Sequence, residues 1–188
     1  TADVADTQFA QQQVSIFLRS VEEVRASGIA VRHVHISNSA SAIRKLDAGA
    51  GCTMARVGIA LYGIPGDAAT NSFGAAHQLD LRPVMSVHAR VSHVHRVSAG
   101  QGVSYGLQRL MEQDATVATI PLGYADGVPR GLWKSGSVLI GGIRRAFAGV
   151  VTMDQILVNC ADDEVSIGDE AVLIGTQGSE LITANEWA

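Results

Sequence analysis

Residues 35–42 read HISNSASA, and their first two residues end VRHVHI, residues 31–36, a stretch that alternates between apolar and polar residues. The alternation predicts a β-strand, and the small residues after it predict a change from strand to helix. The first turn of a helix presents backbone N–H groups without partners, which suit an anion such as phosphate. In a simpler interpretation Ser39 is only the N-cap of the helix. The residues around this junction leave both interpretations open.

Length, composition and charge limit the class of protein. The chain has 188 residues, 47% of them hydrophobic, which is enough to bury the core of one large or two smaller domains. A formal charge of -4, without runs of Lys or Arg, argues against nucleic acid or an anionic membrane as partner. No stretch resembles a membrane span or a signal segment. We therefore expect a cytoplasmic protein with a small substrate.

Cysteines and histidines are the candidate metal ligands in this sequence. Cys52 and Cys160 lie far apart in sequence, so we expect core residues rather than a metal knuckle or a disulfide. Two histidine pairs share a strand face, as a metal site would require: His33 with His35, and His93 with His95. Because neither pair has a Cys or carboxylate at ligand spacing, we predict no metal.

The two ends of the chain both predict helices. Apolar residues from Phe9 to Val24 recur at helical spacing, with Asp6 or Thr7 as the expected cap and Gly28 as the end. At the other end ITANEWA, residues 182–188, predicts a helix capped by Thr183. No initiating Met precedes the first helix. We expect a piece of a longer protein.

The pattern changes once along the chain. The first 62 residues alternate between helix and strand, with strands expected at 31–37 and 55–63 and a helix at 39–50, as in parallel β/α folds. Beyond residue 80 the runs are β-rich and separated by Gly, Asp or Pro, which predicts a small antiparallel barrel or sandwich. These runs cover residues 84–97, 116–125, 137–151, 156–160 and 170–175.

Six blocks of sequence follow one another along the chain: HISNSASA, ARVGIALYG, VSYG, IPLGYADGVPR, GVVTMDQILV and GDEAVLIG. Together, in this order, they resemble the alanine racemases, pyridoxal-phosphate enzymes with a (β/α)8 barrel followed by a β domain. The resemblance covers the later barrel strands and most of the β domain. It implies that residues 1–66 are the C-terminal part of a TIM-type (β/α)8 barrel that binds pyridoxal 5'-phosphate, 67–83 a linker, and 84–188 an all-β antiparallel domain truncated at its C-terminus.

The resemblance also assigns cofactor-binding residues. The first two blocks would be barrel strands seven and eight, and the loops after these strands commonly hold a phosphate. Ser39 and the N–H groups of Gly58 and Ile59 would bind it, so that the capping and phosphate interpretations agree. Arg56 would donate to the pyridine nitrogen and leave it unprotonated, because a guanidinium keeps its protons. His35 would line the pocket. Without its flanking motif, Arg56 would be taken for a surface residue at a strand end.

Racemisation requires one base on each face of the α-carbon. In the family these bases are the cofactor lysine and a tyrosine, and the tyrosine matches Tyr105 in GVSYG. Without the motif, Tyr105 would be taken for a half-buried packing residue. The chain contains only Lys45, in the helix after the phosphate loop, and Lys134, in a turn. Because neither fits the cofactor lysine, we expect that residue in a missing first half and predict that the fragment alone is inactive.

The β-domain blocks supply the substrate side. Tyr124 and Arg130 match family residues along the substrate approach, and Met153 with Asp154 matches a backbone contact near the substrate. In the family these residues reach the cofactor of the other subunit, so the resemblance implies a homodimer with shared sites. From their residue types alone, both blocks could simply be turns.

The sequence departs from the family pattern at two positions. Val150 stands where members often have an Arg, so a charge along the substrate approach is absent. Val57 replaces a common Pro and leaves the neighbouring Arg and Gly in place.

Three classes of function stay open. The first is a racemase that interconverts L- and D-alanine, or one that prefers serine or has a broad specificity. The second is a pyridoxal-phosphate decarboxylase of the same architecture, although VSYG followed by GYADG favours the racemase. The third is a truncated module that dimerises or binds a small anion without catalysis.

Overall fold

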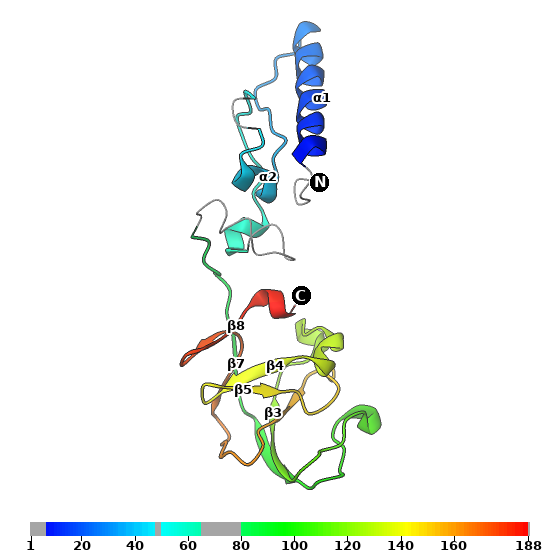
Figure 1. The fold of residues 1–188 in the computed structure, drawn as a ribbon, viewed down its shortest axis with the longest axis vertical. Coiled ribbons are helices and arrows are strands. Elements are labelled where there is room, and N and C mark those ends of the chain that lie inside the picture. Colours follow the sequence, from blue (N-terminus) through cyan, green and yellow to red (C-terminus); the bar gives the residue numbers. More distant parts are fainter. Residues whose placement is uncertain (1–6, 48–49, 65–79, 188) are drawn as a thin grey trace. The chain divides into compact units, whose positions relative to one another are not determined.

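The computed structural model describes residues 7–47, 50–64 and 80–187. The chain divides into two compact units, Thr1–Val84 and Met85–Ala188 (Figure 1). Residues 67–79 of the predicted linker, 67–83, lie outside the described residues. The predicted limits of the two domains stay predictions. In the described ranges no helix is long and apolar enough to traverse a bilayer.

The first unit begins with a long amphipathic helix, α1 (Thr7–Ala26). Gly28 ends it as predicted, since its φ is +84° and its N–H bonds to the Arg25 carbonyl at 3.0 Å. Thr7 is the first described residue of the helix, and Asp6 lies outside the described residues, so the predicted cap stays a prediction. The unit also contains α2 (Ser39–Arg44) and the 3-10 helix η1 (Ile59–Tyr62).

The strands predicted at 31–37 and 55–63 do not form regular strands. Two extended segments lie side by side instead, because the Thr53 N–H bonds to the Val34 carbonyl at 2.8 Å and the Arg56 N–H to the Ser37 carbonyl at 2.9 Å. The constant offset of the two pairs means that the segments run parallel. A barrel strand is stabilised by a neighbour on each side, whereas the described residues give each segment one. The prediction is therefore wrong in detail, and the second run ends in η1.

The helix predicted at 39–50 is shorter than expected, and its cap lies one residue earlier. Asn38 is the N-cap, with its Oδ1 accepting the Ser41 N–H at 2.9 Å, so the prediction that Ser39 caps the helix is wrong. Asn is as good an N-cap as Ser. The helix ends because Lys45 adopts a left-handed conformation, with φ 54°.

The second unit is all β, as predicted, and strands occur in every one of the five predicted runs. Its strands are β1 (Val87–Arg90), β2 (His93–Val97), β3 (Ala115–Ile120), β4 (Ser137–Ile140), β5 (Ile143–Ala146), β6 (Ile156–Asn159), β7 (Glu170–Gln177) and β8 (Glu180–Ile182). One sheet has the order β1-β7-β4-β5, with β8 also pairing with β7, and the other has the order β2-β3-β6. All pairs are antiparallel.

The two sheets are joined at two corners. At one corner the chain passes from β1 to β2, where the Val91 N–H bonds to the Asp169 carbonyl and the Ser92 N–H to the Thr119 carbonyl, both at 2.9 Å. At the other, the chain just after β5 pairs with β6 through the Ala148 N–H and the Leu157 carbonyl, at 2.7 Å. Pairing therefore continues around a ring, and of the two predicted architectures this unit is closer to the barrel.

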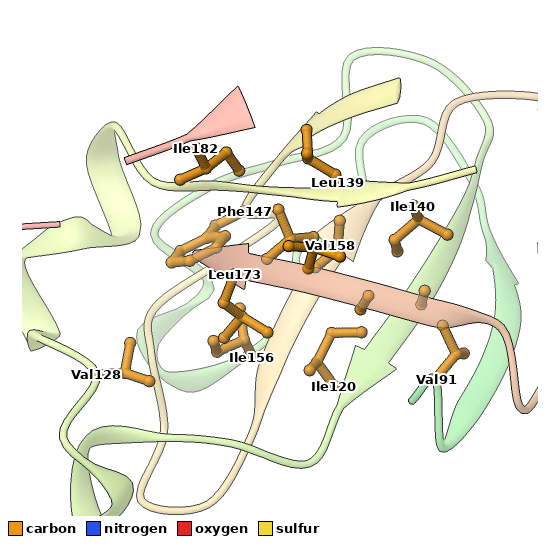
Figure 2. Packing of buried hydrophobic residues seen from close by; sticks show 14 of the residues in the cluster. Val91, Ile120, Val128, Leu139, Ile140, Phe147, Ile156, Val158, Leu173 and Ile182 are labelled. Carbon is orange, nitrogen blue, oxygen red and sulfur yellow. The ribbon is translucent and has the colours of Figure 1, made fainter. Parts of the chain in front are cut away.

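The core of the second unit lies between the two sheets (Figure 2). Phe147 is fully buried there and meets Trp187 edge to face, with ring centroids 6.2 Å apart. Thr183 caps the last turn as predicted, since its Oγ1 accepts the Glu186 N–H at 3.3 Å while its own N–H donates to the Glu186 carboxylate at 2.9 Å. Cys160 is part of this core, as expected, and burial raises the pKa of its thiol. Cys52 is half-buried.

Phe147→Ala should destabilise the chain by about 3 to 5 kcal/mol, because it leaves a cavity where the two sheets and Trp187 meet. Chemical denaturation of the chain measures the change. Ile143→Ala is the matched control, since Ile143 is exposed on β5 and should change stability by only about 0.5 kcal/mol. Equal effects of the two substitutions would show that Phe147 is not a core residue.

Candidate active site

In the first unit a buried serine hydroxyl accepts hydrogen bonds from backbone N–H groups of a turn that is distant in sequence. Ser39, only 6% exposed, accepts the Gly58 N–H at 3.0 Å and the Ala60 N–H at 3.4 Å. Ile59, between them, opens η1, where amides have no partner earlier in the helix. Apart from its chain neighbours, no described residue lies within 4 Å of a Cβ built on Gly58, so this side of the turn is open. The Gly58 and Ala60 amides donate to Ser39 here, and the Ile59 amide and the Ser39 hydroxyl proton are the further donors that suit an anion.

Arg56 and His35 lie in direct contact next to this turn. One guanidinium nitrogen of Arg56 lies 2.6 Å from His35 Nδ1, and the other donates to the Ile36 carbonyl at 3.2 Å. Because a guanidinium has no acceptor, His35 Nδ1 must be the unprotonated ring nitrogen in this contact. The two residues predicted from separate blocks thus form one pair. The bond to the Ile36 carbonyl also holds the Arg56 guanidinium in place.

In the second unit the TMDQ and GYADG blocks are bonded to each other. Residues 152–155 form a tight turn, closed by the Thr152 N–H and the Gln155 carbonyl at 3.0 Å. The Tyr124 and Ala125 N–H groups donate to the Thr152 and Met153 carbonyls at 3.0 and 2.9 Å. A Cβ on Gly123 would collide with the Met153 backbone, so this position requires glycine. The bonds place Tyr124 next to Met153, and both side chains are exposed.

Tyr105 lies at the tip of a loop with an unusual backbone. Ser104 has φ 66° and ψ −177°, a region populated almost only by glycine, which costs on the order of 1–3 kcal/mol for other residues. Gly106 and Leu107 also have positive φ. The turn presents the Tyr105 side chain to solvent at 69% exposure, so Tyr105 is not the half-buried packing residue of the alternative interpretation.

An open groove of about 570 Å³ brings together two of the predicted residues of this unit, Tyr105 and Arg130. Tyr105, Arg130 and Val150 line it together, and the Arg130 guanidinium lies 5.8 Å from the centre of the Tyr124 ring. Val150, the position that departs from the family pattern, therefore faces the same groove as Tyr105. The groove can hold a small molecule beside one tyrosine and one cation.

The remaining candidate residues are more peripheral. Asp154 is exposed in the turn after Met153. Lys45 and Lys134 are exposed, as predicted, with the Lys134 amine 5.6 Å from the Trp133 ring centre. The His93 and His95 rings stack, and no cluster of three or more potential metal ligands occurs among the described residues.

Sequence reasoning missed four residues around the groove and the Tyr105 loop. Gln108 and Trp133 line the groove, and Ser104 and Arg109 bond the loop to the backbone of residues 147–150. Gln108, Trp133 and Arg109 belong to none of the six blocks, so no signal in the sequence could have identified them. Ser104 lies in the VSYG block directly before Tyr105, and this neighbourhood is the one signal that could have pointed to it, because serine as a residue type does not predict a left-handed backbone.

Comparisons with known proteins cover the whole chain. Residues 84–188 match the family model "Alanine racemase, C-terminal domain", and residues 1–65 match "Alanine racemase, N-terminal domain". An alanine racemase of Salinispora arenicola is 42% identical over 187 residues, which cover all of this chain and 48% of that protein.

Solved structures give the same result. The crystal structure of alanine racemase from Bacillus anthracis with bound L-Ala-P matches with a TM-score of 0.90 at 34% identity, covering 100% of this chain and 47% of that one. The enzyme from the D-cycloserine producer Streptomyces lavendulae matches with a TM-score of 0.88 at 34% identity, covering 100% and 48%. The chain thus spans about half the length of its relatives, and the predicted fold class, part of a TIM-type barrel followed by a β domain, is confirmed. The chain belongs to the alanine racemase family.

Proposed function

We propose that this chain is part of a cytoplasmic, pyridoxal-phosphate-dependent isomerase that interconverts L- and D-alanine. The observation that carries the proposal is the convergence of three family blocks, GVSYG, GYADGVPR and GVVTMDQ, on connected loops beside an exposed tyrosine. The related enzyme of Bacillus anthracis has L-Ala-P bound, which supports a small amino acid as substrate.

The first unit fits the cofactor by the chemistry of its donors. Ser39, Gly58 and Ile59 would hold the phosphate, since a buried hydroxyl and the amides of a turn lie together there. Arg56 would donate to the pyridine nitrogen, and His35 would hold Arg56 in place. When bound, the cofactor withdraws electrons from the substrate α-carbon and so makes its proton removable. A permanently charged Arg56 would keep the ring nitrogen unprotonated and limit this withdrawal.

The second unit would handle the proton and the substrate. Tyr105 would remove the α-proton in one direction and return it in the other. Tyr124 and Arg130 would line the substrate approach, and the Met153–Asp154 turn would contact the substrate side. We further propose a homodimer in which these loops complete the partner's site.

Ser39→Ala in the full-length protein should weaken retention of pyridoxal phosphate by about 1.5 to 3 kcal/mol, the range for a hydrogen bond to a charged group. Equilibrium dialysis of the cofactor measures the change. Ser20→Ala is the control, because the Ser20 hydroxyl bonds only within α1. An unchanged dissociation constant would remove Ser39 from the phosphate site.

Tyr105→Phe should slow racemisation by orders of magnitude, because a two-base reaction loses one proton carrier. The fold and cofactor binding should be retained, since the Tyr105 side chain is exposed. Polarimetry with L- and D-alanine measures both directions. A loss of less than tenfold in both directions would show that Tyr105 is not a base.

The 188-residue chain by itself should not racemise alanine, because Lys45 and Lys134 are both exposed and a cofactor lysine needs a dry, positioned site. The test incubates the chain with pyridoxal phosphate and L-alanine, reduces it with borohydride and maps modified lysines. A stoichiometric adduct on either lysine together with D-alanine would contradict the proposal that the cofactor lysine lies outside these residues.

A further inference from the structure

Two side chains tether the Tyr105 loop to one short stretch of backbone. On one side of Tyr105, the Ser104 hydroxyl donates to the Val150 carbonyl at 2.6 Å. On the other side, the Arg109 guanidinium donates to the Phe147 carbonyl at 2.7 Å. The two acceptors are three residues apart on a segment that is itself buried in the β unit. The tip that carries Tyr105 is therefore held at both of its ends.

The rest of the loop does not hold the tip by itself. Below the tip the two arms pair through the backbone, with the Gly100 N–H on the Met111 carbonyl and the Met111 N–H on the Gln101 carbonyl, both at 2.8 Å. Within the tip, Ser104, Gly106 and Leu107 have positive φ, and Leu107 is exposed. Packing holds the loop only up to Val103, which is buried with Met111 in a core cluster, so beyond Val103 the position of the tip depends on the tethers.

The segment that accepts the tethers is shaped for close approach. A Cβ added to Gly149 would lie 2.7 Å from the Val103 carbonyl oxygen and 2.8 Å from Ser104 Cβ, both closer than real contacts allow. Glycine at 149 therefore lets the loop come within hydrogen-bonding distance of Val150. The hydrogen bond between Ser104 and Val150 thus depends on the serine hydroxyl in the loop and on the glycine at 149 in the facing segment.

We propose that Ser104 and Arg109 are positioning residues for Tyr105. The inference rests on the proposed function, in which Tyr105 exchanges a proton with the substrate α-carbon. Proton transfer requires the donor and acceptor atoms within hydrogen-bond reach, so a loose tip lowers the fraction of molecules with Tyr105 in place. Loss of a tether then slows catalysis without removing a reacting group.

The first measurement does not depend on catalysis. In the full-length protein, Ser104→Ala and Ser104→Gly should each raise amide hydrogen exchange of residues 104–108 by on the order of tenfold, since a hydrogen bond of about 1.4 kcal/mol corresponds to that factor. Both substitutions remove the hydroxyl, but only Gly also relieves the left-handed backbone. Ser98→Ala, at an exposed serine near the base of the loop, is the control and should change nothing.

The second measurement uses the reaction. Ser104→Ala should lower kcat by on the order of tenfold with little change in KM, and Arg109→Lys should act in the same direction. With alanine deuterated at the α-carbon, the kinetic isotope effect of these variants should exceed the wild-type value for one enantiomer only. The reason is that Tyr105 removes the proton in one direction only. General destabilisation of the fold would not produce this asymmetry.

The outcomes separate the inference from the proposed function. Unchanged hydrogen exchange in both Ser104 variants would overturn the tether, and faster exchange with unchanged kcat and isotope effects would overturn its role in positioning. If Tyr105→Phe is fully active while exchange still increases in the Ser104 variants, the proposed function fails, and the positioning role fails with it. Faster exchange, slower turnover and a one-sided isotope effect together support the proposal.

Discussion

The candidate site of the β unit depends on the backbone carbonyls of residues 147–153. Phe147 and Val150 accept side-chain bonds from the Tyr105 loop, and Thr152 and Met153 accept amide bonds from the GYADG loop. The same segment enters the core at its beginning, where Phe147 is fully buried. The Tyr105 loop and the GYADG loop are therefore both hydrogen-bonded to the same backbone segment, residues 147–153. Rigid support of this kind keeps reactive side chains in place although they are exposed.

The first unit uses the same principle with the roles of donor and acceptor exchanged. There a single buried acceptor, the Ser39 hydroxyl oxygen, gathers amides from a turn about twenty residues away. The parallel pairing of residues 34–37 with 53–56 brings that turn next to the start of α2. Because Asn38 caps α2, the Ser39 hydroxyl is available for this second task. Capping and the proposed contact with an anion thus fall to two neighbouring residues.

The sequence predicted the β unit far better than the first unit, for a physical reason. Strands such as β3 and β7 have an apolar or alternating sequence, and this chain also contains the strands with which they pair. The strand predicted from the sequence pattern can therefore form in the structure. The segment at 31–37 has a strand pattern, but the described residues supply only one neighbour. The motif residues of the site could be named from the resemblance. Arg109 lies outside every block, and Ser104 lies in VSYG but its role could not be predicted, because a side chain that bonds to a backbone carbonyl leaves no pattern in sequence.

The energetics of Ser104 indicate why a serine, rather than a glycine, suits this position. Its backbone conformation costs on the order of 1–3 kcal/mol for a residue with a Cβ, whereas a neutral hydrogen bond such as that to Val150 contributes only about 0.5–1.5 kcal/mol. Glycine would avoid the cost, so stability alone favours glycine at this position. The hydroxyl instead restricts the orientation of the next residue, which is Tyr105. A residue that is unfavourable for folding but fixes its neighbour is expected where the neighbour's position matters more than a small loss of stability.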